Sequence, residues 1–368
     1  MKKLLLTFIS VSMMFILSCC SRLASADDNE SGSESEITTT EADTTTENIT
    51  TTTEPTTIEP TTTEPPTTTP EATTTQPTTT TAAERETTSI APIAFAGPME
   101  ANSFADHGKE LNVYGNLSSD DSRIKELQSL LQSYNKNISL IAWRKDGTKA
   151  VSYNTSQTYF SACTIKAGYI LNICKIIDSG MVDENTLITY ESKHYHKGSG
   201  QIKYSEYGTQ YSIKTLINLC LSISDNVAYE MLIDYFGFTE YNAMVDQLGC
   251  SSIRLSSMWA SKAKVKDYVV IWNEIYNYLE SGAKMSSLLK ESCTNTPFNY
   301  GTETLKEGVD YSHKSGDNFG NSPAYNDAGI VWEDNAYIYA VFTRSEGTSY
   351  DISTVNDAMD IVYDIMTE

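Results

Sequence analysis

Apolar and polar positions follow regular periods only after about residue 120 of the 368-residue chain. Between residues 120 and 135, apolar side chains recur every three or four positions, which predicts an amphipathic helix. Ile138–Arg144 and Lys149–Tyr153 are short apolar runs joined by Asp146-Gly147. This arrangement is typical of a β-hairpin, because Asp-Gly suits a tight turn.

The remaining pattern predicts helices in the middle and strands near the end. Helices are expected at 164–178, 212–222, 226–235, 239–248, 265–280 and 352–366, and strands at 311–315, 324–332 and 336–344. Strands at both ends with helices between them predict an α+β fold. Its antiparallel sheet would be closed by remote segments and flanked by helices, with an all-helical subdomain inserted.

The first nineteen residues are expected to be an export signal. Lys2 and Lys3 precede an apolar run over residues 4–17, which is too short to span a bilayer comfortably. The run ends in Ile-Leu-Ser-Cys19, which resembles a bacterial lipobox, so we expect Cys19 to be lipidated and to anchor the protein outside the cytoplasm, at the cell surface. Cleavage after Ala26 with soluble secretion, or an uncleaved anchor, are the alternatives.

Residues 20–95 form a separate low-complexity segment. Residues 37–90 contain 27 Thr and 6 Pro, with no hydrophobic period, which predicts an extended, disordered linker. The 14 acids and one base of residues 27–90 give this segment a net charge of -13, out of -22 for the chain. The acidity therefore belongs largely to the linker, and the globular domain is expected at 110–368.

Charge and cysteine usage exclude several classes of function. A net charge of -22 argues against a nucleic-acid partner. Seven cysteines, an odd number without a C-x-x-C pair, do not indicate a disulfide framework or a zinc site. His194 and His196 lack a third ligand at useful spacing, so we expect no metal site. We also expect that the protein has no cofactor and is a monomer. The four cysteines interpreted as buried apolar residues are Cys174, Cys220, Cys250 and Cys293.

Three short motifs occur in a recognisable order. Phe160-Ser-Ala-Cys-Thr-Ile-Lys166 opens a predicted helix, Ser224-Asp225-Asn226 lies between two helices, and His313-Lys-Ser-Gly316 ends a strand. Together they resemble the S-x-x-K, S-D-N and K-[ST]-G motifs of class A β-lactamases and penicillin-binding proteins. Flanking segments that strengthen this resemblance are Gly198-Ser-Gly200, Tyr211-Ser-Ile-Lys-Thr-Leu-Ile217 and Asn326-Asp-Ala-Gly-Ile-Val331. It spans residues 120–366 and implies the β-lactamase/transpeptidase fold.

Two departures from the family pattern bear on activity. The x-x-K spacing places Cys163 where the family carries its nucleophilic serine, since Ser161 lies five residues before Lys166. Residues 251–266 contain no Asp or Glu. In class A β-lactamases this stretch is an omega loop whose glutamate activates the deacylating water, and here it looks shortened.

The resemblance implies a role for each motif residue. Cys163, Lys166 and Ser224 would be catalytic, with Ser224 relaying a proton to the leaving nitrogen. A thiol with a pKa of about 8.5 ionises more readily at a helix N-terminus beside an ammonium, so Lys166 would serve as its counter-ion. The substrate would be bound by Asn226, Lys314, Ser315, Gly316 and Asp317. Among these, Lys314 and Ser315 would hold its carboxylate, Asn226 its acyl-side-chain amide, and the amides of Cys163 and Asp317 its oxyanion.

Each of these residues also has a structural interpretation. The structural interpretation of Cys163 is a small buried residue that replaces a lost serine. The structural interpretation of Ser224-Asp225-Asn226 is an ordinary helix cap. Two hypotheses follow. The first is an exported β-lactamase-related acyl-transfer hydrolase with slow deacylation, acting on β-lactams, as in β-lactam catabolism, or on D-alanyl peptidoglycan peptides. The alternative is a catalytically inactive surface module that binds cell-wall peptides, and an amidase is a distant third.

Overall fold

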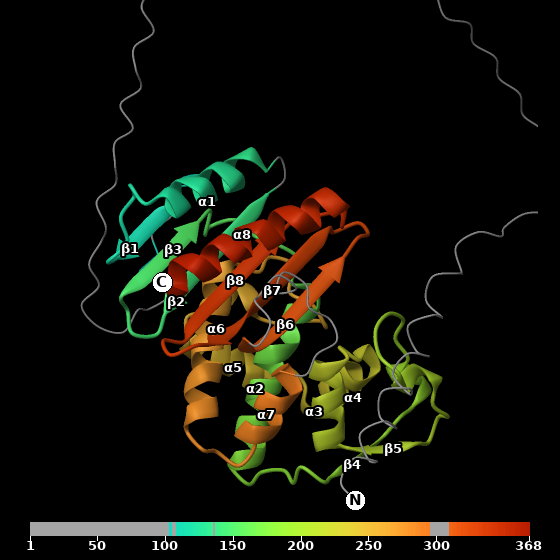
Figure 1. Ribbon diagram of the computed structural model, residues 1–368. Helices are drawn as coiled ribbons and strands as arrows, with labels where there is room; N and C mark the ends of the chain where they lie inside the picture. Colours follow the sequence, from blue (N-terminus) through green and yellow to red (C-terminus); the bar gives the residue numbers. More distant parts are fainter. Residues whose placement is uncertain (1–102, 105–107, 135–136, 295–308) are drawn as a thin grey trace, which may run out of the picture. The chain divides into compact units, whose positions relative to one another are not determined.

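A six-stranded antiparallel sheet forms the centre of the computed structural model, which describes residues 103–104, 108–134, 137–294 and 309–368 (Figure 1). The strand order is β1-β3-β2-β8-β7-β6. The N-terminal hairpin therefore pairs with the C-terminal strands through β2 and β8, as the sequence predicted. The strands are β1 (Asn112–Gly115), β2 (Ile138–Arg144), β3 (Lys149–Tyr153), β6 (Asp310–Asn318), β7 (Ala324–Trp332) and β8 (Tyr337–Thr343).

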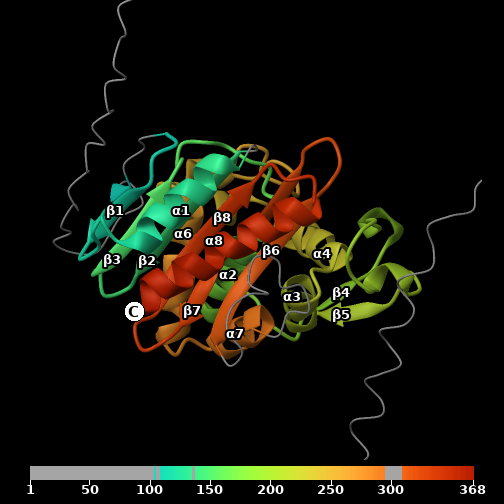
Figure 2. The ribbon, with the colours of Figure 1, turned by 45° about the horizontal axis from the view of Figure 1, so that its top comes forward.

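Alternation along the strands supplies two separate hydrophobic cores. In β2, Leu140 and Ala142 face the side covered by α1 (Ser122–Ser133) and α8 (Ser349–Thr367), whereas Ile141 faces the other side. Helices α1 and α8 lie side by side over the first face in both ribbon views (Figures 1 and 2). The opposite face packs against α6 (Val265–Glu280). The sheet is thus covered on both faces, and β2, β7 and β8 are almost wholly buried.

The helical lobe lies between β3 and β6 in the sequence. Its helices are α2 (Ile165–Asp178), α3 (Ile213–Ser222), α4 (Asn226–Phe236), α5 (Thr239–Gln247) and α7 (Ser286–Thr294). A two-stranded antiparallel ribbon, β4 (Leu187–Thr189) and β5 (Gln210–Ser212), precedes α3. Short 3₁₀ turns are η2 (Ala162–Thr164), η3 (Ser192–His194), η4 (Ile202–Tyr204) and η5 (Ser251–Ile253). The inserted helical subdomain is confirmed, but it is not all-helical, because the β4–β5 ribbon lies between α2 and α3.

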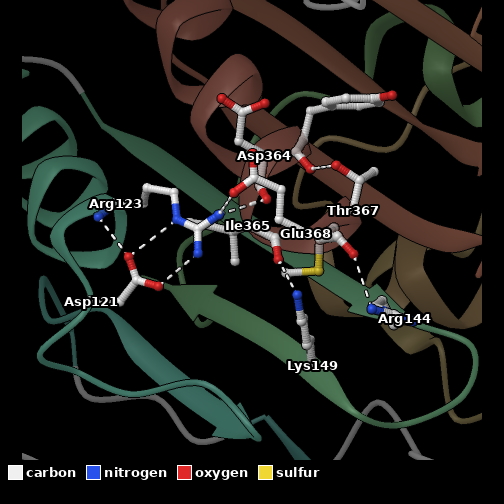
Figure 3. A network of polar contacts seen from close by, with 10 residues as sticks. Asp121, Arg123, Arg144, Lys149, Asp364, Ile365, Thr367 and Glu368 are labelled. Carbon is white, nitrogen blue, oxygen red and sulfur yellow. Dashed lines mark hydrogen bonds and ion pairs between the residues drawn. The ribbon is translucent and has the colours of Figure 1, made fainter.

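The last turn of α8 is held by three cations, one on α1 and one each on β2 and β3. Arg123 donates to the carbonyl of Asp364 at 3.1 Å, and Lys149 donates to that of Ile365 at 2.9 Å (Figure 3). Arg144 donates to the carbonyl of Met366 at 3.3 Å. The carbonyls at a helix C-terminus lack intrahelical partners and carry partial negative charge, so these cations both satisfy and stabilise the end of α8.

Several sequence predictions lie outside the described residues. They are the signal peptide at 1–19, with its lipidation site Cys19, and the linker at 20–95. In the part of the chain that is described, no helix combines the length and apolar character needed to cross a bilayer.

Candidate active site

Cys163 lies in η2, the turn that leads into α2. The preceding residue, Ala162, has φ of 45°, a conformation that costs a non-glycine residue of order 1–3 kcal/mol. The neighbouring residue Ser161 fixes this backbone conformation, because its N–H donates to the carbonyl of Ala260 at 2.9 Å. The amide of Ala260 in turn donates to the Ser161 hydroxyl at 3.1 Å. Backbone strain therefore lies directly beside the thiol of Cys163.

Lys166, one turn further along, is fully buried. Its Nζ donates to the Ser224 carbonyl at 2.7 Å, to the Ser224 hydroxyl at 3.3 Å and to Asn226 Oδ1 at 2.7 Å. An ammonium carries three N–H donors and no acceptor, so three oxygen partners match its protonated form. Asn226 Oδ1 also lies 3.9 Å from the Cys163 sulfur. Both the thiol and the ammonium are therefore held against one amide oxygen.

Asp225 organises the turn between α3 and α4. As the N-cap of α4, its Oδ1 accepts from the amides of Val227 at 2.9 Å and Ala228 at 3.0 Å. Its Oδ2 accepts from the amides of Gln201 at 2.7 Å and Ile202 at 2.9 Å. One carboxylate therefore joins α4 to the loop that precedes it by more than twenty residues. Ser224, with φ of 56°, is held on the cleft side of this joint.

Strand β6 supplies the third motif. Lys314 is buried, and its Nζ donates to the Ser315 carbonyl at 2.9 Å. Gly316 lies directly against η2, since a Cβ there would be 2.4 Å from the Cys163 nitrogen and 2.7 Å from the Thr164 nitrogen. The glycine thus allows the strand backbone and the N-terminus of the helix to approach without an intervening side chain.

These elements enclose a cleft of about 340 Å³. Of the residues predicted for the site, those that line it are Cys163, Ser224, Asn226, Lys314, Ser315 and Asp317. Lys166 and Gly316 are not among the lining residues; Lys166 is buried beside Asn226, and Gly316 packs against η2. The three motifs therefore meet at one cleft, and Cys163 is partly exposed there rather than enclosed in a core.

Aromatic residues to which the sequence assigned no role in substrate binding form part of the wall. Phe160, His196, Trp259 and Phe319 all line the cleft. Trp259 packs edge-on against Phe160 at 6.4 Å and tilted against Tyr229 at 5.7 Å between ring centroids. Phe160 and Phe319 lie near a motif in the sequence, and this proximity was their only signal. Trp259 had none, because it is more than thirty residues away from Asn226. This wall gives the cleft an aromatic side, and the buried Lys166 Nζ lies 5.7 Å from the centroid of the Trp259 ring.

A family model for the β-lactamase enzyme family matches residues 122–366, which include η2, the α3–α4 turn and β6. The chain belongs to this family. The match covers the sheet and the helical lobe together, and the resemblance based on three motifs is thereby confirmed. The α+β class with its antiparallel sheet is likewise confirmed.

Solved structures agree on the fold of this family member. PBP-A shares 20% sequence identity with a TM-score of 0.61, over 67% of this chain and 96% of that one. A class A β-lactamase from Bacteroides cellulosilyticus shares 21% identity with a TM-score of 0.58, over 66% and 96% of the two chains. A β-lactamase from Sphaerobacter thermophilus shares 18% identity with a TM-score of 0.58, over 65% and 95%.

Two ammonium groups dominate the electrostatics at Cys163. Burial alone raises the pKa of the Cys163 thiol, but Lys166, Lys314 and a hydrogen bond with Ser224 more than offset it, so that this pKa lies below its ordinary value. By contrast, burial raises the pKa of Cys220 and Cys293 to about 12. Among the described cysteines, all of them free thiols, Cys163 alone has a lowered pKa.

The remaining predicted features have structural roles. Cys174, Cys220, Cys250 and Cys293 are buried, as expected. His194 Nδ1 accepts from the amide of Glu191 at 3.0 Å, and its Nε2 lies 3.2 Å from Asp234. Within the described residues, no group of three potential ligands is placed to hold a metal. The first acid after the acid-free segment 251–266, Asp267, accepts from the amide of Ser252 at 2.9 Å and so fixes that segment.

Proposed function

We propose that this family member is an exported acyl-transfer enzyme that attacks β-lactams or D-alanyl peptides of peptidoglycan with Cys163 and forms a thioester. The observation that carries the proposal is that a thiol of lowered pKa opens into a cleft beside Lys166 and Lys314. A catalytically inert replacement for serine has no need of such electrostatics. Perturbed groups in a cleft are typical of functional sites.

The acylation step follows from the contacts. The Cys163 thiolate attacks the carbonyl carbon, and the oxyanion is stabilised by the backbone N–H groups of Cys163 and Asp317. As the C–N bond breaks, the nitrogen takes a proton from the Ser224 hydroxyl, which is replenished from Lys166 at 3.3 Å. Lys314 and Ser315 hold the substrate carboxylate, and Asn226 holds the acyl-side-chain amide. The products of this step are a thioester, a protonated nitrogen and a neutral Lys166.

Deacylation is proposed to be slow. The segment from Ser251 to Lys266 contains no carboxylate, and it presents the indole of Trp259 to the cleft instead. Asp317, the described carboxylate that lines the cleft, lies on β6 rather than on this segment. Loss of a general base for water typically costs about 10² to 10⁴ in rate. The thioester should therefore accumulate.

The export signal completes the proposal. Lipidation of Cys19, with residues 20–95 as a spacer, would place the domain outside the cytoplasm, where peptidoglycan and β-lactams are encountered. The domain would then act at the cell surface as a membrane-tethered enzyme.

A fluorescent penicillin tests the proposal directly. We expect one equivalent of label, mapped to the Cys163 peptide and absent in Cys163→Ala, with a stoichiometric burst of β-lactam absorbance change and little turnover afterwards. Sustained turnover of many equivalents per second would contradict slow deacylation. Absence of both label and burst would contradict the acyl-transfer function and favour a module that only binds wall peptides.

A further inference from the structure

The neighbours of Trp259 hold its indole at a defined place beside the site. The carbonyl of Met258 accepts from the Tyr229 hydroxyl on α4 at 3.1 Å. On the other side, Ala260 exchanges two hydrogen bonds with Ser161, the residue before η2. The Ala260 carbonyl accepts from the Ser161 amide at 2.9 Å, and the Ala260 amide donates to the Ser161 hydroxyl at 3.1 Å. The indole is therefore fixed both to α4 and to the turn that carries the thiol.

Three rings that line the cleft meet at Trp259. Its indole packs edge-on against Phe160, with 6.4 Å between ring centroids, and against His196, with 6.3 Å. All three side chains line the same cleft as Cys163, and each is partly exposed. We call Phe160, His196 and Trp259 the aromatic corner. A further flat ring can pack against this group, because aromatic rings attract one another edge-on or offset.

The aromatic corner adjoins Asn226, the residue proposed to hold the amide of the acyl side chain. Asn226 Nδ2 donates to the Lys197 carbonyl at 3.0 Å. His196 Nδ1 lies 2.6 Å from the same oxygen and donates to it, because a carbonyl oxygen can only accept. Lys166 Nζ, which donates to Asn226 Oδ1 at 2.7 Å, lies 5.7 Å from the centroid of the Trp259 ring. A substrate whose amide is bound by Asn226 therefore has the corner next to its side chain.

The aromatic corner contains rings and no carboxylate. Among the described residues that line the cleft, the acid is Asp317, which lies on β6 with Lys314 and Ser315. An ammonium group on the acyl side chain would leave water without a carboxylate partner at the corner, which is costly for a charge. An uncharged ring has no such cost and gains apolar contact. The corner thus favours an uncharged aromatic side chain over a cationic one.

We propose that the aromatic corner is the subsite for an uncharged aromatic side chain on the acyl group, and that Trp259 is its specificity-determining residue. The inference rests on the proposed function and narrows its two substrate classes to one. β-Lactams with an arylacyl side chain fit the corner, whereas D-alanyl peptides with an ammonium group on the acyl part do not. Trp259 touches the part of the acyl group that does not react, so it acts on the choice of substrate.

Two pairs of reagents measure the preference for a phenyl group at Cys163. One pair is benzylpenicillin and the penicillin with an acetyl side chain. The other pair, which needs no acyl transfer, is N-benzyliodoacetamide and iodoacetamide. Each rate is divided by that with a small free thiol, and mass spectrometry of the Cys163 peptide identifies the adduct. In the wild type we expect the phenyl member of each pair to react about 10-fold faster. A penicillin with an α-ammonium on its phenylacetyl group should lose most of that advantage.

Variants locate the preference in the protein. Trp259→Leu keeps an apolar side chain but removes the ring, and should abolish most of the preference, whereas Trp259→Phe should retain most of it. Tyr350→Leu is the control, since Tyr350 is exposed on α8, which covers the face of the sheet opposite α6. If circular dichroism shows that Trp259→Leu is unfolded, Phe160→Leu removes another ring of the corner and should reduce the preference as well.

The outcomes separate this inference from the proposed function. No phenyl preference in the wild type, an equal preference in Trp259→Leu, or the same loss in Tyr350→Leu would overturn the subsite. Equal rates for the penicillins with and without the α-ammonium would overturn the selection against cations. A wild-type protein that prefers N-benzyliodoacetamide but is not acylated by any penicillin would contradict the proposed function and support the subsite.

Discussion

A Cβ atom added to Gly316 would lie 2.4 Å from the backbone nitrogen of Cys163. The backbones of the edge strand β6 and the turn η2 therefore approach each other closely at Gly316. Cys163 owes its position to this contact on one side and to the Ser161–Ala260 hydrogen bonds on the other. Any side chain at Gly316 must separate the strand from the turn.

The first prediction concerns this contact. Gly316→Ala should lower the rate of penicillin labelling at Cys163 by about 100-fold, because a displacement of about 1 Å is enough to misalign reacting groups. Gly320→Ala is the matched control, since a Cβ at Gly320 has only Asn318 Oδ1 nearby, at 3.7 Å. Rates are measured by quantifying labelled protein over time. Equal rates for Gly316→Ala and the wild type would contradict the proposed importance of this approach.

The second prediction concerns the thiol itself. Because the pKa of Cys163 is lowered, its alkylation by iodoacetamide should reach half-maximal rate at a pH below that of an ordinary thiol, and the rate should rise with pH as thiolate forms. Lys166→Met removes an adjacent ammonium and should raise this midpoint by about 1 to 2 pH units. Lys175→Met on the same helix, where Lys175 pairs with Glu274, is the control and should leave it unchanged. Peptide mapping identifies the Cys163 adduct, and an unchanged midpoint in Lys166→Met would show that Lys166 does not set this pKa.

Regular periodicity explains which elements the sequence predicted. The bounds of β2, β3 and β7 agree with the predictions, because each strand is followed by turn residues. Strand β1 has four residues and β4 and β5 have three each, too few for a pattern to emerge. Helix α7 was also missed, since it buries Ser286 and Ser292 beside only a few apolar residues. Its position depends on packing against α3 and β6, which no local pattern reveals.

The residues of the candidate site that belong to a sequence motif were predictable, whereas the other residues that line the cleft were not. Cys163, Ser224 and Lys314 were found because the spacing of each motif is local. Trp259 and His196 reach the cleft from loops fixed by distant partners, as when the Tyr229 hydroxyl donates to the Met258 carbonyl at 3.1 Å. The left-handed backbone of Ala162 and Ser224 was equally unpredictable, since neither residue type favours positive φ.

The third prediction concerns the end of α8. Lys149→Met removes the ammonium that donates to the Ile365 carbonyl at 2.9 Å, and should lower the free energy of unfolding by about 0.5 to 1 kcal/mol. Lys125→Met is the control, because Lys125 is exposed and forms a 3.3 Å ion pair with the exposed Asp120. Urea unfolding measures both. Equal midpoints for the two variants would show that this cation does not stabilise the helix end.

The fourth prediction concerns the proposed anchor. If Cys19 is lipidated, the full chain should sediment with membranes, and Cys19→Ala should release it or block its maturation. Cys20→Ala is the neighbouring control, since it leaves the lipidated position intact. Membrane fractionation followed by immunoblotting separates the cases. Unchanged sedimentation of Cys19→Ala, with the linker intact, would contradict a lipoprotein.

The last prediction concerns the joint at Asp225. Its two oxygens accept four backbone N–H groups, two at the start of α4 and two from Gln201 and Ile202. In Asp225→Asn one oxygen becomes an NH₂ group that must face N–H donors, so at least one pair of hydrogen bonds is lost within the core. We expect a loss of about 3 kcal/mol, which corresponds to roughly 6 to 12 °C in the melting temperature of a domain of this size.

Asp225→Asn should also slow penicillin labelling, because Asp225 holds Ser224 and Asn226 in place between α3 and α4. Asp246→Asn is the matched control: Asp246 is exposed and pairs with Arg254, so both melting and labelling should stay near those of the wild type. Differential scanning calorimetry and labelling rates, measured well below the melting transition, distinguish the two effects. Normal labelling in a strongly destabilised Asp225→Asn variant would mean that the cleft is positioned by other contacts. Slow labelling at an unchanged melting temperature would place the contribution of Asp225 in the cleft geometry alone.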